Sequence, residues 1–145
     1  MEMSLPIHLK KLSVGTTCLQ DLQDWQKRQI ESWGHCFHTT RNWPKQAESL
    51  KRSGSIYWVV KGAYLARQKI EDLQPVFFES DDKNLKPRCK IIFYPELIPV
   101  EAWPHRPFQG WRYLLPKDAP SDIKLEDVEN QEIFKELYTL GIGLK

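Results

Sequence analysis

Two short segments of the chain combine cationic side chains with flat aromatic rings, which is the combination that binds phosphates and bases. The denser one, residues 105–113, alternates two arginines with aromatic rings. Guanidinium groups match phosphate oxygens, and aromatic rings stack on any base. We therefore expect Arg106 and Arg112 to contact phosphates, Trp111 to stack and Gln109 to read a base edge. The alternative is a loop that its aromatic rings pin to the core.

The second such segment, residues 38–45, lies where a strand is expected to pass into a helix. Backbone amides at a helix start favour anions such as phosphate. Arg41 and Lys45 would add positive charge there, and Trp43 could stack on a base. In the alternative interpretation, Trp43 fills a gap in the core beside a capped helix.

A third group of candidates lies on and after the strongest predicted strand, residues 55–61. Tyr57 and Lys61 share one face of that strand, and the apolar side chains between them look like core on the other face. Lys61 precedes Gly62, and a strand glycine lets a ligand approach the backbone closely. We add Tyr57, Lys61 and Arg67 to the candidate nucleic-acid contacts. The alternative is a surface lysine before a bulge glycine.

Signatures of metal or nucleophilic chemistry are sparse. The chain has no P-loop, no GxGxxG and no GxSxG motif. His35, Cys36 and His38 are close in sequence, but no fourth zinc ligand accompanies them. Cys36 with a histidine has no identifiable acid to orient the pair. We expect no metal and no cofactor.

Helices predicted from the sequence are few. Apolar residues recur at three- to four-residue spacing over residues 18–33, which predicts an amphipathic helix ended by Gly34. A shorter helix is expected over residues 44–50, closed by Gly54. A third could form over residues 128–140, where an apolar stripe would pack on the body or on a protein partner.

Strands account for most of the remaining pattern. Seven of the ten prolines lie between Pro87 and Pro120, which excludes a long regular element there. The order strand, helix, strand, helix and then strands favours an α+β fold over a doubly wound parallel sheet. The expected strands cover residues 7–14, 36–41, 55–61, 64–73, 89–94 and 111–114.

Length and charge favour one domain with an acidic tail. The 145 residues suit a single domain, which we place at residues 1–120, with a tail at 121–145. Residues 1–117 carry 18 Lys/Arg and 12 Asp/Glu, whereas residues 118–145 carry 3 and 7. A basic body with an acidic tail is one form of a nucleic-acid-binding protein. The alternatives are a solvated surface or a tail that screens the body.

The expected compartment is the cytoplasm. Three scattered cysteines are too few for a disulfide scaffold, and reduced thiols fit a cytosolic protein. No apolar run approaches the roughly 20 residues that span a bilayer, and the first eleven residues do not resemble a signal peptide. We expect no membrane association.

Five stretches together resemble a family of short bacterial proteins known as domain of unknown function 1489. The resemblance runs from His8 to about Pro120 and brings no established activity. It is carried by Thr40-Arg41-x-Trp43-Pro44 and by residues 54–62, 66–70, 95–99 and 106–113.

The order of elements is also similar to ASCH and EVE domains, which are PUA-like. That likeness implies a small, partly open mixed β-barrel flanked by two or three helices, with RNA or a modified nucleobase bound in a cleft beside it. Some ASCH relatives are amidohydrolases with a Thr-Lys-Glu set. Residues 54–58 lack the expected Lys-Thr pair. A hydrolase here would need Lys61, Thr40 (or Thr39) and Glu71 (or Glu96) to converge.

These observations predict a PUA-like α+β protein that binds RNA or a modified nucleotide in a basic, aromatic cleft without covalent chemistry. Two alternatives stay open. One is a small hydrolase acting on a nucleoside, and the other is a protein-interaction adaptor that uses residues 128–140.

Overall fold

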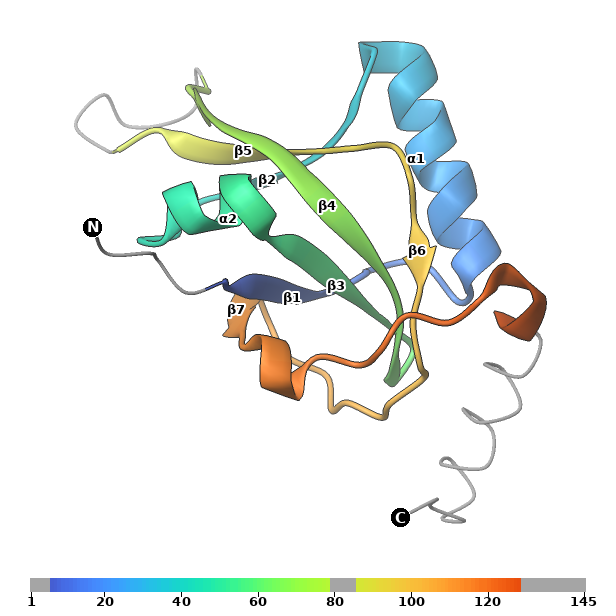
Figure 1. Ribbon diagram of the computed structural model, residues 1–145. Helices are drawn as coiled ribbons and strands as arrows, with labels where there is room; N and C mark the ends of the chain where they lie inside the picture. The colour runs from blue at the N-terminus through green and yellow to red at the C-terminus, as the bar shows by residue number, and fades with distance from the viewer. Residues whose placement is uncertain (1–5, 79–85, 129–145) are drawn as a thin grey trace.

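A computed structural model of the protein describes residues 6–78 and 86–128 (Figure 1). This part of the chain is α+β, with two α-helices, α1 (Leu19–Trp33) and α2 (Ala47–Ser53), and two short 3-10 turns, η1 (Pro116–Asp118) and η2 (Leu125–Asp127). The predicted helix over 128–140 lies outside the described residues beyond position 128. The seven strands are β1 (His8–Leu12), β2 (Cys36–Thr40), β3 (Ser55–Val60), β4 (Ala63–Val76), β5 (Arg88–Phe93), β6 (Ile98–Pro99) and β7 (Trp111–Leu114).

These strands form one mixed sheet that does not close into a barrel. Its order is β2-β5-β4-β3-β1-β7, with β6 paired to β4. Only β1 and β3 pair in parallel, and every other named pair is antiparallel. Within the described residues, β2 and β7 therefore end the sheet, and each leaves one edge without a strand neighbour.

Strand β4, with 14 residues, is the longest strand and pairs with three others. Its first half pairs with β3 on one edge and with β6 on the other, and its second half pairs with β5. The register shifts between Trp58 and Val59 of β3 and between Ile70 and Asp72 of β4. Such irregularities bend strands and increase their twist, so they curl the sheet.

A two-residue turn joins β3 to β4. Lys61 and Gly62 both have positive φ, at 48° and 93°. Tight hairpin turns of this kind need two residues in that region, which glycine adopts without steric cost. Gly62 therefore serves the turn, and Lys61 projects from its tip as an exposed side chain.

Apolar side chains fill both faces of the sheet. We define the inner face as the one that carries Leu9, Trp58 and Phe93 and packs against Leu22 of α1 and Leu50 of α2. The outer face carries a second cluster with Tyr57, Val59, Tyr64, Val100 and Leu114, which the chain between Pro99 and Pro120 covers. Every residue of β3 is buried as a result.

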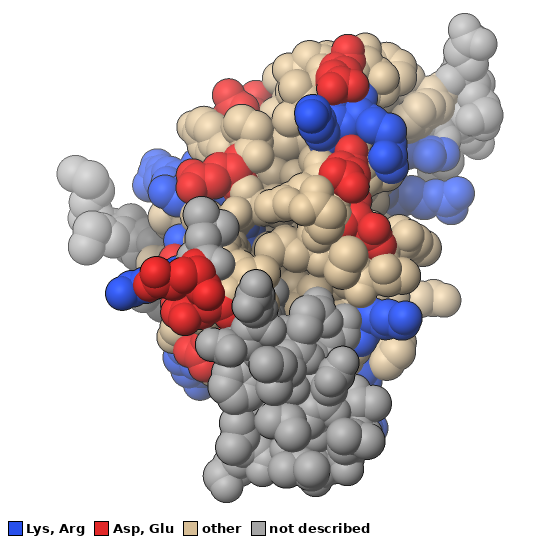
Figure 2. Space-filling model, turned by 90° about the vertical axis from the view of Figure 1, so that its right-hand side faces the viewer, with Lys and Arg blue, Asp and Glu red and all other residues tan. Residues whose placement is uncertain are grey.

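Charge is mixed on the side of the molecule that α1 occupies. Figure 2 shows Lys and Arg interspersed with Asp and Glu there, with much uncharged surface between them. Interspersed charges of both signs are typical of a solvated surface and do not steer a polyanion. This side of the molecule therefore carries no continuous basic surface among its described residues.

Candidate functional site

The two end strands of the sheet approach each other beside the loop that follows β2. The Trp111 indole N–H of β7 donates to the Asn42 carbonyl at 3.3 Å, and the Gln46 backbone N–H donates to the Tyr113 hydroxyl at 3.1 Å. Between this loop and β7 lies an open cleft of about 680 Å³. Side chains and single backbone groups bridge its two walls, in place of a strand ladder.

Six of the residues singled out in the sequence line this cleft. They come from two segments more than sixty residues apart, which the curl of the sheet brings together. One supplies Thr40, Trp43 and Lys45, and the other supplies Gln109, Trp111 and Arg112.

The two tryptophans of the cleft are partly exposed and fixed in orientation. The Trp43 indole donates to the Pro87 carbonyl at 3.1 Å, and the ring packs against the inner core. Trp111 meets the ring of Tyr113 edge to face, at 5.0 Å between centroids. Because each indole N–H has a partner, both rings are held in place before any ligand arrives.

The polar wall of the cleft is formed by exposed side chains. Arg112 donates through Nη1 to the carbonyls of Gln109 and Trp111, at 2.8 and 3.1 Å. These contacts curl the guanidinium over the turn that precedes β7. Lys45 is exposed on the opposite wall, and Arg41 is exposed in the same loop but does not line the cleft. The cleft therefore combines two cations with two indoles.

Two titratable groups lie next to cleft residues: His38, which the sequence analysis considered only for metal or nucleophilic chemistry, and Lys11, which it did not single out. His38 and Lys11 face inward, since alternate residues of one strand share a face. Burial, and secondarily the nearby Lys11 ammonium, lower the pKa of His38 to about 4. Burial also lowers the pKa of Lys11. The available signal was a histidine and a lysine, each two residues along a strand from a buried apolar residue, Cys36 and Leu9 respectively.

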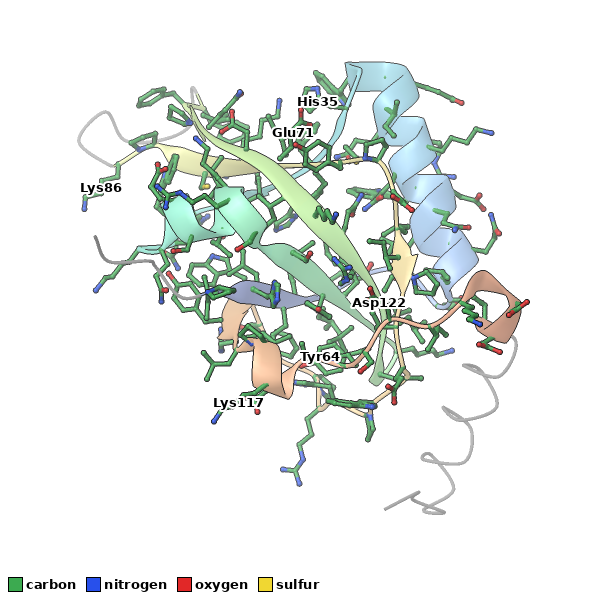
Figure 3. The ribbon with its side chains drawn as sticks, viewed as in Figure 1. His35, Tyr64, Glu71, Lys86, Lys117 and Asp122 are labelled. Carbon is green, nitrogen blue, oxygen red and sulfur yellow. The ribbon has the colours of Figure 1, made fainter. Side chains whose placement is uncertain are left out.

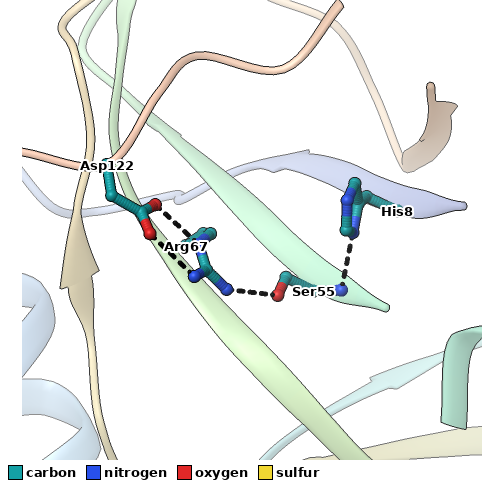
Figure 4. Close-up of polar contacts among 4 residues, drawn as sticks. All are labelled: His8, Ser55, Arg67 and Asp122. Carbon is teal, nitrogen blue, oxygen red and sulfur yellow. Dashed lines mark hydrogen bonds and ion pairs between the residues drawn. The ribbon is translucent and has the colours of Figure 1, made fainter. Parts of the chain in front are cut away.

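Arg67 lies away from the cleft, and each of its three side-chain nitrogens donates a hydrogen bond (Figure 4). Its Nε and Nη2 donate to the two carboxylate oxygens of Asp122, at 2.7 and 2.8 Å, and its Nη1 donates to the Ser55 hydroxyl at 3.0 Å. The hydrogen bond to Asp122 raises the pKa of Arg67. Arg67 borders a different cleft, which has a volume of about 770 Å³ and lies beside α2. Arg67 therefore links β4 to Ser55 and to Asp122, and its charge is already paired with a carboxylate.

The other predicted contacts are dispersed. Tyr57 is 5% exposed and belongs to the outer core, so its ring is not presented to a ligand. Lys61 lies at the β3–β4 turn. Arg106 is exposed in the loop that precedes β7. This loop lies beside the β3–β4 turn, since the His105 backbone N–H donates to the Gly62 carbonyl at 2.9 Å.

The residues required for the hydrolase alternative do not gather at one point. Figure 3 shows Tyr64 near the start of β4 and Glu71 toward its far end. Lys61 lies three residues before Tyr64, so β4 separates it from Glu71. Thr40 alone of that set lines the cleft, and Glu96 borders the cleft beside α2.

The described part of the chain carries neither a metal-ligand cluster nor a membrane-spanning helix. Residues 6–78 and 86–128 contain no group of three or more His, Cys, Asp or Glu side chains placed to hold a metal ion. Cys36 is buried, and burial raises the pKa of its thiol. Among the described helices, none has the length and apolarity to cross a membrane.

Comparison with known proteins relates the chain to a family. Neither the curated proteins nor the solved structures include one that matches this chain. A family described as "Protein of unknown function (DUF1489)" matches residues 9–142, which is nearly the whole chain. The stretches from Thr40 to Pro44 and from Arg106 to Tyr113, which line or border the cleft, fall inside that match. The chain therefore belongs to the DUF1489 family.

Proposed function

We propose that the protein binds single-stranded RNA or a modified nucleotide in the cleft between the β2–α2 loop and β7, without covalent chemistry. One observation carries the proposal. Two indoles, two cations and a glutamine, drawn from distant segments, converge on one open cleft of about 680 Å³. That volume is in the range of small-molecule sites, and the open side leaves room for a chain to continue.

Each wall of the cleft has a role that suits a nucleotide. Trp43 and Trp111 offer ring surface for base stacking, which contributes about 1–3 kcal/mol per base. Lys45 and Arg112 supply positive charge for phosphates. The Gln109 amide has both donors and an acceptor, so it can pair with a base edge.

The same features support a PUA-like assignment of the fold. The sheet is mixed, curled and open, and the cleft lies where its two end strands approach. Two helices cover the inner face. We propose that the cleft between the β2–α2 loop and β7 is the ligand cleft of a partly open PUA-like barrel. Thr40 is the single member of the hydrolase set in the cleft, so the proposal includes no bond-breaking step.

The test is binding of a fluorescein-labelled five-residue RNA to the purified protein, measured by anisotropy across a salt series. We expect micromolar or tighter binding at low salt. Trp111→Leu should weaken it by about tenfold or more, because a stacking platform is lost. Lys45→Met should weaken it less and make it less sensitive to salt.

The matched control is Lys27→Met, which removes an exposed charge from α1 on the other side of the molecule. It should bind like the parent protein. The proposal fails if the parent protein binds neither the RNA nor any of the four nucleoside monophosphates. Equal affinities of the parent protein and Trp111→Leu would also contradict it.

A further inference from the structure

An unneutralised pair of cations lies on the outer face of the sheet, next to the cleft. Lys10 of β1 and Arg112 of β7 are direct partners in the antiparallel ladder, so their side chains leave the same face. Like charges placed directly opposite in a sheet destabilise it. Within residues 6–78 and 86–128, neither cation forms an ion pair with a carboxylate. An anionic ligand would remove this repulsion.

The side chains of Lys10 and Arg112 both contact the ring of Phe108. The Lys10 ammonium lies 5.8 Å from the ring centroid, and the Arg112 guanidinium carbon lies 6.0 Å from it. Cation–π contacts at exposed sites contribute about 0.5–1 kcal/mol each, so they offset part of the repulsion. They leave the net charge of the pair unchanged.

His105 fixes the position of the Lys10 ammonium. Its Nδ1 lies 2.6 Å from the Arg106 carbonyl, which can only accept, so Nδ1 carries the hydrogen. Nε2 is then the acceptor for the Lys10 ammonium at 2.9 Å. The imidazole also packs against Phe108 and Tyr64, at 4.7 and 5.5 Å between centroids. An ammonium has three donors, and this contact uses one.

The cluster of Lys10, His105, Phe108 and Arg112 is continuous with the cleft because Arg112 borders both. On the other side, the His105 backbone N–H binds the Gly62 carbonyl, which brings Lys61 and Arg106 to the same region. Positive charge therefore extends away from the cleft along the outer face. A mononucleotide seated in the cleft would leave this charge uncovered.

We infer that this cluster is a second phosphate site and that the ligand is a polynucleotide chain, with a base in the cleft and a neighbouring phosphate on Lys10 and Arg112. The inference rests on the proposed function and names its ligand class. His105 and Phe108 are positioning residues, since they hold the two cations in place and need not touch the ligand.

The experiment compares uridine 5′-monophosphate with a five-residue oligouridylate on the parent protein, Lys10→Met and Lys10→Arg. The pentanucleotide should bind more tightly than the monophosphate. Lys10→Met should lower the pentanucleotide affinity about tenfold, as expected for one hydrogen bond to a charged group, and leave monophosphate affinity unchanged. It should also reduce the slope of log K against log salt by about 0.7, whereas Lys10→Arg should restore most of the affinity.

Lys27→Met serves again as the equal-charge control, and circular dichroism checks that each variant folds. Equal affinity for the two ligands would overturn the inference. So would a Lys10→Met variant that weakens both ligands alike or neither. If the parent protein binds neither of these two ligands nor any of the other nucleoside monophosphates, the proposed function itself fails. Equal binding of the two ligands overturns only the second phosphate site.

Discussion

His38 lies neutral inside the curl of the sheet, close enough to Lys11 for the two charges to oppose each other. Burial is the larger cause of its lowered pKa, and Lys11 is the second. On the same face, Thr40 lines the cleft and Lys11 lies opposite Trp111. A proton on His38 would place a second positive charge beside Lys11 in a poorly solvated position. This single residue therefore links acidity to stability.

The first prediction concerns that link. Free His38 titrates near pH 6.5, whereas in the folded protein its pKa is about 4. Between these values the unfolded chain binds more protons, so the free energy of unfolding should fall as the pH drops from about 6.5 to 4. The full loss would be at most about 3 kcal/mol.

Urea unfolding at pH 7.5, 6.0, 5.0 and 4.5 measures this loss. His38→Gln should flatten the pH dependence in that window. His8 should retain part of it, because burial and Arg67 lower its pKa as well. A His38→Gln variant with the parent pH dependence would contradict the assignment.

At the scale of elements, a buried amide pair attaches α1 to the sheet. Gln26 of α1 is 3% exposed and Gln68 of β4 is fully buried. Each amide donates to the oxygen of the other, at 2.7 and 2.8 Å. Gln68 also accepts from the Trp58 indole at 3.2 Å and donates to the Tyr94 carbonyl at 2.8 Å. Buried polar groups are stable only when each finds a partner, so the pair fixes where α1 packs.

The second prediction is that these two amides are energetically coupled. Gln26→Leu should destabilise the protein by about 1–3 kcal/mol, because Gln68 loses a partner in a dry site. Gln68→Leu should cost more, since it also leaves Trp58 and Tyr94 without their contacts. The double variant should be more stable than the sum of the single losses predicts. A double-mutant cycle from urea unfolding measures this coupling, and strict additivity would contradict it.

At the scale of the whole molecule, the chain after β7 closes over the outer face and returns to the middle of the sheet. The Glu101 backbone N–H donates to the Ser121 carbonyl, and the Ile123 N–H donates to the Pro99 carbonyl, both at 2.9 Å. Between these bonds, Asp122 forms its two-oxygen ion pair with Arg67 (Figure 4). Arg67 lowers the pKa of Asp122 through this hydrogen bond. Arg67, whose side chain is partly buried, thereby ties this segment to the body of the protein.

The third prediction is that this tie stabilises the fold and does not serve binding. Asp122→Asn should lower the free energy of unfolding at pH 7 by about 1–2 kcal/mol, a figure reduced because the carboxylate is half exposed. Because the folded pKa of Asp122 is depressed, its contribution is present at neutral pH and is lost as the pH falls through that pKa.

Thermal and urea unfolding of Asp122→Asn measure the loss, with Asp118→Asn as the exposed control on η1. Both variants should bind RNA like the parent protein, since neither residue lines the cleft. An Asp122→Asn variant as stable as Asp118→Asn would show that the ion pair contributes nothing measurable.

Local patterns in the sequence predicted most of the elements. The helix expected over 18–33 is found at Leu19–Trp33, and the strand expected at 111–114 is found there. The second helix begins later than expected, at Ala47, and the Tyr113 hydroxyl accepts a hydrogen bond from the backbone N–H of its N-cap, Gln46. That contact comes from a distant strand, and no neighbour of Gln46 in sequence indicates it.

The sequence alone determined the features that depend on residues close together along the chain. These are the periodicity of the helices and strands, the turns, and the two basic and aromatic segments at 38–45 and 105–113. Tertiary structure alone decided that these segments share a cleft, that Tyr57 is buried beneath the returning chain, and that Arg67 is neutralised by Asp122. Each of these depends on which strands pair across long stretches of chain. Strand pairing is set by burial of distant apolar faces against one another, and a single sequence does not state which faces meet.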